Sequence, residues 1–198
     1  MKKFTHYDAA AILTELERLP VGGYVCKILN VEMQRGIYSD AMVLNVDVCE
    51  GEYTGFYSRN YKNQTQDKKK WKGNVRVTLP KDDGSAEDQY TMRIFKTTIK
   101  NIEESNPGYI WNWDEQSLKG LVVGVIARNK EYDYMGKTGF WTELFKTFQA
   151  DKVRTGEYKM PKDKLLKEKS TSYAPYVPPA SANAGFAELD EDDGELPF

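Results

Sequence analysis

The sequence predicts a mainly β domain. We expect a five-stranded barrel with a helix between the third and fourth strands, an extra N-terminal helix and a disordered C-terminal tail. Five runs have the apolar and polar patterning of strands, two have helical spacing, and the composition changes sharply after residue 169. With 198 residues, of which 40% are hydrophobic, the chain is long enough for one domain core with extensions.

The first predicted element is an amphipathic helix from Asp8 to Arg18. Asp8 can act as its N-cap, because a carboxylate accepts hydrogen bonds from the free backbone N–H groups of a first turn. Apolar side chains recur at helical spacing behind it, at Ile12, Leu13, Leu16 and Leu19. Pro20 and the Gly22-Gly23 pair then end the helix.

Three predicted strands follow, at Tyr24–Val31, Ala41–Cys49 and Asn74–Leu79. Apolar and polar side chains alternate along them, so that one face of each strand is apolar. The same alternation puts the two cysteines, Cys26 and Cys49, on opposite faces, and we therefore expect no disulfide between them.

A helix is predicted over Gln89–Glu104, with Asn106-Pro107-Gly108 as its end. Two longer strands, Leu118–Arg128 and Phe140–Val153, complete the domain, and Glu131–Gly139 joins them as a glycine-containing turn. In the last strand, alternation assigns Phe140, Leu144 and Phe148 to one face and Trp141 and Phe145 to the other.

The order of these elements is that of the OB-fold, a five-stranded barrel. A small open α+β sheet would produce the same order, so both architectures are compatible with the sequence. By composition, residues 1–169 form the predicted domain, residues 170–185 form a flexible linker rich in Pro, Ser and Ala, and residues 186–198 form an acidic tail.

The charge is distributed unevenly along the chain. The formal net charge is −2, from 28 basic and 30 acidic side chains. Six of the acids and none of the bases lie in residues 186–198, so the other 185 residues hold 28 bases against 24 acids, or +4. A near-neutral total thus hides a modestly basic body that can suit phosphates and an acidic tail that can suit a basic protein pocket.

Several function classes are not expected. The longest apolar stretch, Gly120–Ala127, is far shorter than the ~20 residues of a membrane span. Two cysteines and one histidine cannot supply a four-ligand zinc site of the Cys/His type, and we expect no cofactor or metal. Gly136-Lys137-Thr138 lacks the first glycine of a P-loop, and an enzyme is not expected. Reduced thiols and the absence of a signal-peptide pattern favour the cytoplasm.

The segment from Tyr53 to Lys72 interleaves aromatic and basic side chains with a single acid, Asp67. Cations neutralise phosphates and release counterions, while aromatic faces stack on unpaired bases. The alternative is a solvated lysine-rich loop whose aromatic side chains anchor a short helix. The candidate nucleic-acid-binding residues of this segment are Tyr57, Arg59, Tyr61, Lys62, Lys68, Lys69, Lys70, Trp71 and Lys72.

Two loops that border the ligand face of an OB-fold add further candidates. Arg35 lies in the connection between the first two strands. The connection between the last two strands and its flanks supply Arg128, Lys130, Tyr132, Tyr134, Lys137 and Trp141. The alternatives are an ordinary polar hairpin tip and, for Trp141, a second packing surface.

The tail ends in an apolar tip that carries the terminal carboxylate. Such a tip can enter a pocket of a partner protein, where basic side chains grip the carboxylate and the acids. A purely solubilising tail would need no apolar tip. The predicted partner-docking residues are Asp190, Glu191, Asp192, Asp193, Glu195, Leu196, Pro197 and Phe198.

This ending, behind a linker and an OB-like body, resembles the C-terminus of bacterial and phage single-stranded DNA-binding proteins (SSBs). Residues 19–26, Leu-Pro-Val-Gly-Gly-Tyr-Val-Cys, and the basic aromatic segment resemble a phage or prophage group from Gram-positive bacteria. The resemblance implies single-stranded DNA coverage in replication, recombination or repair, and recruitment of a helicase, primase, exonuclease or recombination mediator. It implies the host cytoplasm and leaves a homo-oligomer open.

Two rival functions remain at this stage. An OB-like adaptor would bind proteins through its body, and a metal-dependent nuclease would use some of the plentiful carboxylates. RNA is a third alternative as the ligand, because stacking surfaces do not by themselves distinguish RNA from DNA.

Overall fold

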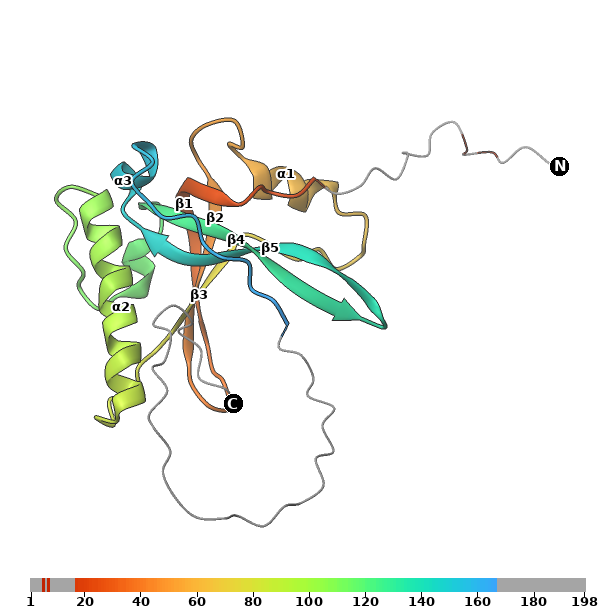
Figure 1. The fold of residues 1–198 in the computed structure, drawn as a ribbon. Coiled ribbons are helices and arrows are strands. Elements are labelled where there is room, and N and C mark those ends of the chain that lie inside the picture. Colours follow the sequence, from red (N-terminus) through yellow and green to blue (C-terminus); the bar gives the residue numbers. More distant parts are fainter. Residues whose placement is uncertain (1–4, 6, 8–16, 167–198) are drawn as a thin grey trace, which may run out of the picture. The chain divides into compact units, whose positions relative to one another are not determined.

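The computed structural model describes residues 5, 7 and 17–166 of the chain. This part contains five strands, three α-helices and one 3-10 helix (Figure 1). In chain order they are β1 (Gly22–Gln34), β2 (Ala41–Val48), α1 (Phe56–Asn63), β3 (Asn74–Thr78), α2 (Ala86–Ser105), η1 (Glu115–Leu118), β4 (Val122–Tyr134), β5 (Lys137–Phe148) and α3 (Ala150–Arg154).

The five strands form one antiparallel sheet in the order β3-β2-β1-β4-β5. The two edge strands, β3 and β5, contact each other, but no backbone ladder pairs them and the sheet is not closed. The predicted mainly β class, the five strands and the helix between the third and fourth strands are confirmed. The closed barrel is not seen.

The main core lies on one face of the sheet, under α1, α2 and η1. Ile28, Leu44 and Val125 of the strands are fully buried there, because alternation turns every second side chain inward. From the helices, Ile102 of α2 and Leu118 of η1 are also fully buried. Ser85 begins α2 by accepting a hydrogen bond from the Asp88 N–H, which explains why the helix starts three residues before the predicted Gln89.

A second, smaller core covers the opposite face, where Val25 and Ile126 pack against Ala150 and Val153 of α3. The prediction that a strand runs to Val153 is therefore wrong: β5 ends at Phe148 and α3 follows. Cys26 belongs to the main core and Cys49 packs against the second, so the prediction of opposite faces is confirmed, and both thiols are free.

A β-bulge in β5 changes the predicted faces of that strand. Ile126 pairs with Lys146 and Ala127 with Leu144, so Phe145 is an extra residue in the ladder. The bulge reverses the alternation. Leu144 consequently lies in the main core while Phe148 packs against the second core, and their predicted shared face is wrong.

The β4–β5 hairpin is longer than predicted and extends away from the rest of the sheet (Figure 1). Its turn contains only Met135 and Gly136, both with positive φ (51° and 77°), a backbone that matches the twist of a tight hairpin. Most of the predicted Glu131–Gly139 turn is therefore strand. The fourth strand begins at Val122, because Leu118, its predicted start, belongs to η1.

Two predicted regions fall largely outside the described residues. Residues 8–16 of the expected N-terminal helix are not described, and Glu17 and Arg18 are not helical, so the helix does not reach Arg18. The chain divides into a compact unit, Met1–Leu166, and a second unit, Lys167–Phe198, which contains the linker and the acidic tail and is outside the described residues. None of the described helices has both the length and the apolar character needed to cross a membrane.

Candidate nucleic-acid interface

Strand pairing brings six of the predicted residues together on one face of the β4–β5 hairpin. Side chains that are directly opposite in an antiparallel pair share a face, and so do residues two apart along a strand. The register pairs Lys130 with Trp141 and Tyr134 with Lys137. We call the resulting surface the hairpin face; it consists of Arg128, Lys130, Tyr132, Tyr134, Lys137 and Trp141.

The aromatic members of the hairpin face are open to solvent. Tyr132, Tyr134 and Trp141 are 42%, 70% and 47% exposed. The Lys130 ammonium lies 5.4 Å from the centre of the Trp141 ring, a cation–π contact. A Cβ at Gly139 would come within 2.7 Å of the Tyr132 hydroxyl oxygen, so glycine is what allows the Tyr132 ring to lie across the partner strand. The face thus combines cations and exposed rings.

One acid, Glu143, lies within this surface. Its carboxylate accepts hydrogen bonds from Arg128 Nε at 2.9 Å and from Lys130 Nζ at 3.0 Å. The Arg128 guanidinium also stacks on Phe145, 3.7 Å from the centre of the ring. Glu143 was not predicted from the sequence, although it could have been found by extending the alternation two residues beyond Trp141. Phe145 was assigned to the face of Trp141 but not named as a candidate residue.

The aromatic and basic segment between β2 and β3 contains the helix α1. No side chain within the helix caps it; instead the buried Asp47 of β2 accepts from the Tyr57 N–H at 2.8 Å and the Ser58 N–H at 3.1 Å. This anchor turns Tyr57 into the main core, where the residue is 5% exposed and burial raises the pKa of its hydroxyl. Tyr57 presents no ring face to a ligand, and we remove it from the candidate residues. Arg59 is exposed and donates to the Thr54 carbonyl oxygen.

The basic loop after α1 is folded onto a buried amide. Gln64 Nε2 donates to the Lys70 carbonyl oxygen and Gln64 Oε1 accepts from the Lys70 N–H, both at 2.8 Å. Lys69 Nζ donates to the Lys62 carbonyl oxygen at 2.9 Å. The side chains of Lys62, Lys68, Lys70 and Lys72 are exposed around this loop. Hydrogen bonds of Gln64 and Lys69 therefore hold the loop together although its like charges repel.

Beside the loop, Tyr61 and Trp71 lie with their ring centres 5.8 Å apart. Tyr61 is 39% exposed, and Trp71 is partly buried and donates through Nε1 to the Gly73 carbonyl oxygen at 3.0 Å. Tyr57 therefore anchors the short helix α1 to the core, whereas the Tyr61 ring is partly exposed. Arg35 lies exposed in the connection between β1 and β2, which is distant in sequence from the hairpin face and from the segment Tyr53 to Lys72.

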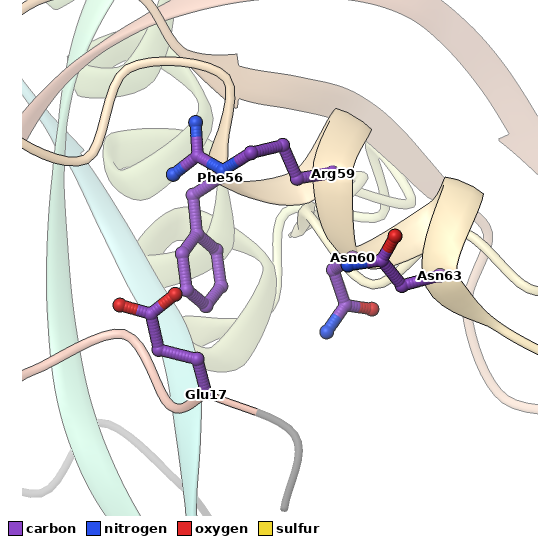
Figure 2. A pocket seen from close by; sticks show the side chains of 5 residues that line it. All are labelled: Glu17, Phe56, Arg59, Asn60 and Asn63. Carbon is purple, nitrogen blue, oxygen red and sulfur yellow. The ribbon is translucent and has the colours of Figure 1, made fainter. Parts of the chain in front are cut away.

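A small cavity of about 80 Å³ separates α1 from the N-terminal segment (Figure 2). Phe56, Arg59, Asn60 and Asn63 line it from α1, and Glu17 lies across from them. Ligand sites usually measure roughly 300–1,000 Å³, so we interpret this cavity as a packing gap. Within residues 5, 7 and 17–166, no cluster of three or more His, Cys, Asp or Glu side chains could hold a metal ion.

The predicted partner-docking residues, Asp190 to Phe198, lie outside the described part of the chain. The described part ends beside the hairpin: the Glu131 N–H donates to the Lys164 carbonyl oxygen and the Lys164 N–H donates to the Asn129 carbonyl oxygen, both at 2.8 Å. Lys164 thereby pairs with the part of β4 that extends beyond its pairing with β1.

Comparison with models of protein families and with curated proteins produced no match to this chain.

Proposed function

We propose that the protein binds single-stranded DNA with little sequence preference, using the hairpin face as its main contact surface. The observation that supports the proposal most is the register of β4 and β5, which gathers cations and exposed rings on one side of a projecting hairpin. Cations that track phosphates, together with rings that stack on bases, are the two components of sequence-tolerant single-strand binding.

The architecture supports the same proposal. We propose that the sheet is an OB-fold that is open between β3 and β5, since its strand order and the position of α2 are those of that fold. In OB-folds the loop between the last two strands borders the nucleic-acid-binding surface. The hairpin face lies on that loop and the strands leading into it.

The proposed mechanism is stoichiometric, not catalytic. Lys130, Lys137 and Arg128 neutralise phosphates, while Tyr132, Tyr134 and Trp141 stack on unpaired bases. Excluding the acidic tail, the chain carries a net charge of +4, which favours the encounter with a polyanion. Coverage of this kind protects exposed strands and opposes hairpin formation in them.

Titration of the full chain with oligo-dT tests the proposal. We expect intrinsic tryptophan fluorescence to be quenched, with an affinity that falls steeply as salt rises, and we expect duplex DNA of equal length to bind more weakly. Tyr134→Ala should weaken oligo-dT binding about tenfold, since stacking contributes ~1–3 kcal/mol per base. Tyr90→Ala is the matched control, because Tyr90 is a 44% exposed tyrosine on α2. Absence of binding at low salt would refute the proposal and leave the protein adaptor as the better candidate.

The proposal also assigns the acidic tail to partner recruitment. A chain lacking Leu196, Pro197 and Phe198 should lose capture of a helicase, primase, exonuclease or recombination mediator and keep full affinity for oligo-dT. Pull-down with the full and shortened chains, each with and without oligo-dT, measures both properties. A shortened chain that recruits the same partners would contradict the role of the tip.

A further inference from the structure

A hollow of about 320 Å³ lies between the basic loop and the paired strands β1 and β2. It shares no residue with the hairpin face. One side is lined by Tyr61 of α1 together with Lys69 and Trp71 of the loop, and the other side by Leu29, Asn30 and Asn45 of the strands. Leucine and asparagine in a strand do not by themselves indicate a binding site, and these residues were not predicted from the sequence. The fold brings them next to the loop.

The floor of the hollow is made by a β-bulge in β1. The β1–β2 register passes from Ile28 directly to Asn30, which leaves Leu29 as the extra residue with 37% of its surface exposed. Beside it, Asn30 pairs directly with Asn45, and both amides donate through Nδ2 to Glu32 Oε1, at 3.3 and 2.7 Å. The floor therefore combines an apolar surface with two amides held by a shared carboxylate.

The wall of the hollow is aromatic and held in place. The Tyr61 and Trp71 rings are inclined at 49° to each other, and the Lys69 ammonium lies 5.9 Å from the centre of the Tyr61 ring. The Trp71 indole is fixed by its hydrogen bond to Gly73 and by packing on the main core. The Gln64 amide, bonded to Lys70, holds the loop that carries Lys69. Little conformational entropy remains to be lost when a flat ligand enters.

We propose that this hollow is a subsite for one unpaired nucleobase of the bound strand. The inference rests on the proposed function. An aromatic wall suits the face of a base, the amides suit its polar edge, and the exposed lysines of the loop suit the phosphates on either side of it. The volume is at the lower end of the range for ligand sites, which fits one ring system and not a larger ligand.

Indole NMR signals of the full chain, labelled with ¹⁵N in its four tryptophans, test the subsite. Single Trp→Phe variants assign the four signals. The probes are oligo-dT and an abasic deoxyribose-phosphate oligomer of equal length. We expect oligo-dT to shift the signals of both Trp71 and Trp141. The abasic oligomer should shift the Trp71 signal much less than oligo-dT does, because it offers charge to the loop lysines but no base to the ring.

Two outcomes would overturn the subsite while leaving the proposed function intact. In one, oligo-dT shifts Trp141 but not Trp71; in the other, the abasic oligomer shifts Trp71 as strongly as oligo-dT does, which would make the hollow a phosphate contact. No binding of oligo-dT at low salt would refute the function itself. In the first outcome, a Trp71 signal that moves on addition of a protein partner would assign the hollow to an apolar side chain of that partner.

A substitution provides the second measurement. Tyr61→Ala removes a partly exposed ring that lies outside the main core, so the variant should fold. We expect it to weaken oligo-dT binding between about 5-fold and 150-fold and to leave binding of the abasic oligomer unchanged. Tyr90→Ala again serves as the control. An equal loss for the two oligomers would contradict base stacking in the hollow.

Discussion

Glu143 offers the sharpest test of the hairpin face. Its carboxylate accepts from both Arg128 and Lys130, two of the cations assigned to phosphates. Phosphate must therefore compete with Glu143 for these side chains. Glu143→Gln keeps the size and shape of the residue and removes the competing charge, so we expect the variant to bind single-stranded DNA more tightly than the parent chain.

The expected magnitude follows from counterion release. In the parent chain, Arg128 and Lys130 divide their charge between Glu143 and phosphate. Each cation that the variant frees completely steepens the dependence of log K on log salt by up to about 0.7 for single strands, so two cations steepen it by up to about 1.4. Across a fourfold rise in salt, the advantage of the variant should shrink by up to about sevenfold. The variant should lose about 1 kcal/mol of unfolding free energy at most, because the paired side chains remain partly exposed, at 12% to 32%.

The assay is a set of oligo-dT titrations at several salt concentrations, with urea unfolding as a measure of stability. Glu104→Gln is the matched control: it removes the same charge from a carboxylate that pairs with Lys100 on α2, away from the hairpin. A Glu143→Gln affinity and salt slope that match those of Glu104→Gln would refute the assignment of the hairpin face to phosphates.

Three further predictions concern the body of the protein. Asp47→Ala leaves two backbone N–H groups of α1 without their buried acceptor and should cost about 3 kcal/mol in urea unfolding, whereas a loss below 1 kcal/mol would contradict the anchor. Arg154 lowers the pKa of Glu50 below its ordinary 4.5, so the pair stabilises the fold above that pH and the benefit is lost as pH falls through the lowered value. Glu50→Gln should therefore be less stable at pH 7 by under ~1 kcal/mol and equal to the parent in acid; a deficit that persists in acid would refute the pairing. Burial raises the pKa of both thiols, so a disulfide reagent at pH 8 should modify Cys49 slowly and Cys26 only on unfolding, and rapid modification of Cys26 would contradict its full burial.

The element types could be read from the sequence wherever local periodicity is strong. The β2 strand was predicted to within one residue. Phe95, Ile99 and Ile102 recur at helical spacing along α2 and are buried in the core. The predicted turn was too long, because Tyr132 and Tyr134 are polar enough to lie in a loop. Their segment is extended because it pairs with the opposite strand. The bulge at Phe145 has no local signature, since it arises from the register of two strands.

The candidate residues divide in the same way. Interleaved lysines, arginines and aromatic side chains predicted the candidate residues, because charge and ring type are properties of the residues themselves. Whether a ring faces solvent is not such a property. Tyr57 and Tyr61 are four residues apart in one basic segment, yet the first is buried in the core and the second borders an open hollow. Leu29 and Asn45 carried no signal at all.

Periodicity and charge along the sequence predict a mainly β body with excess basic charge, followed by an acidic tail with an apolar tip. Local periodicity and charge are additive along a chain, so they can be read without knowing the fold. Which side chains meet depends instead on how the strands pair in the folded protein. The register of β4 with β5 assembled the hairpin face, and the bulge at Leu29 opened the hollow beside Trp71. Both depend on strand pairing, in which a shift of one residue moves every following side chain to the other face.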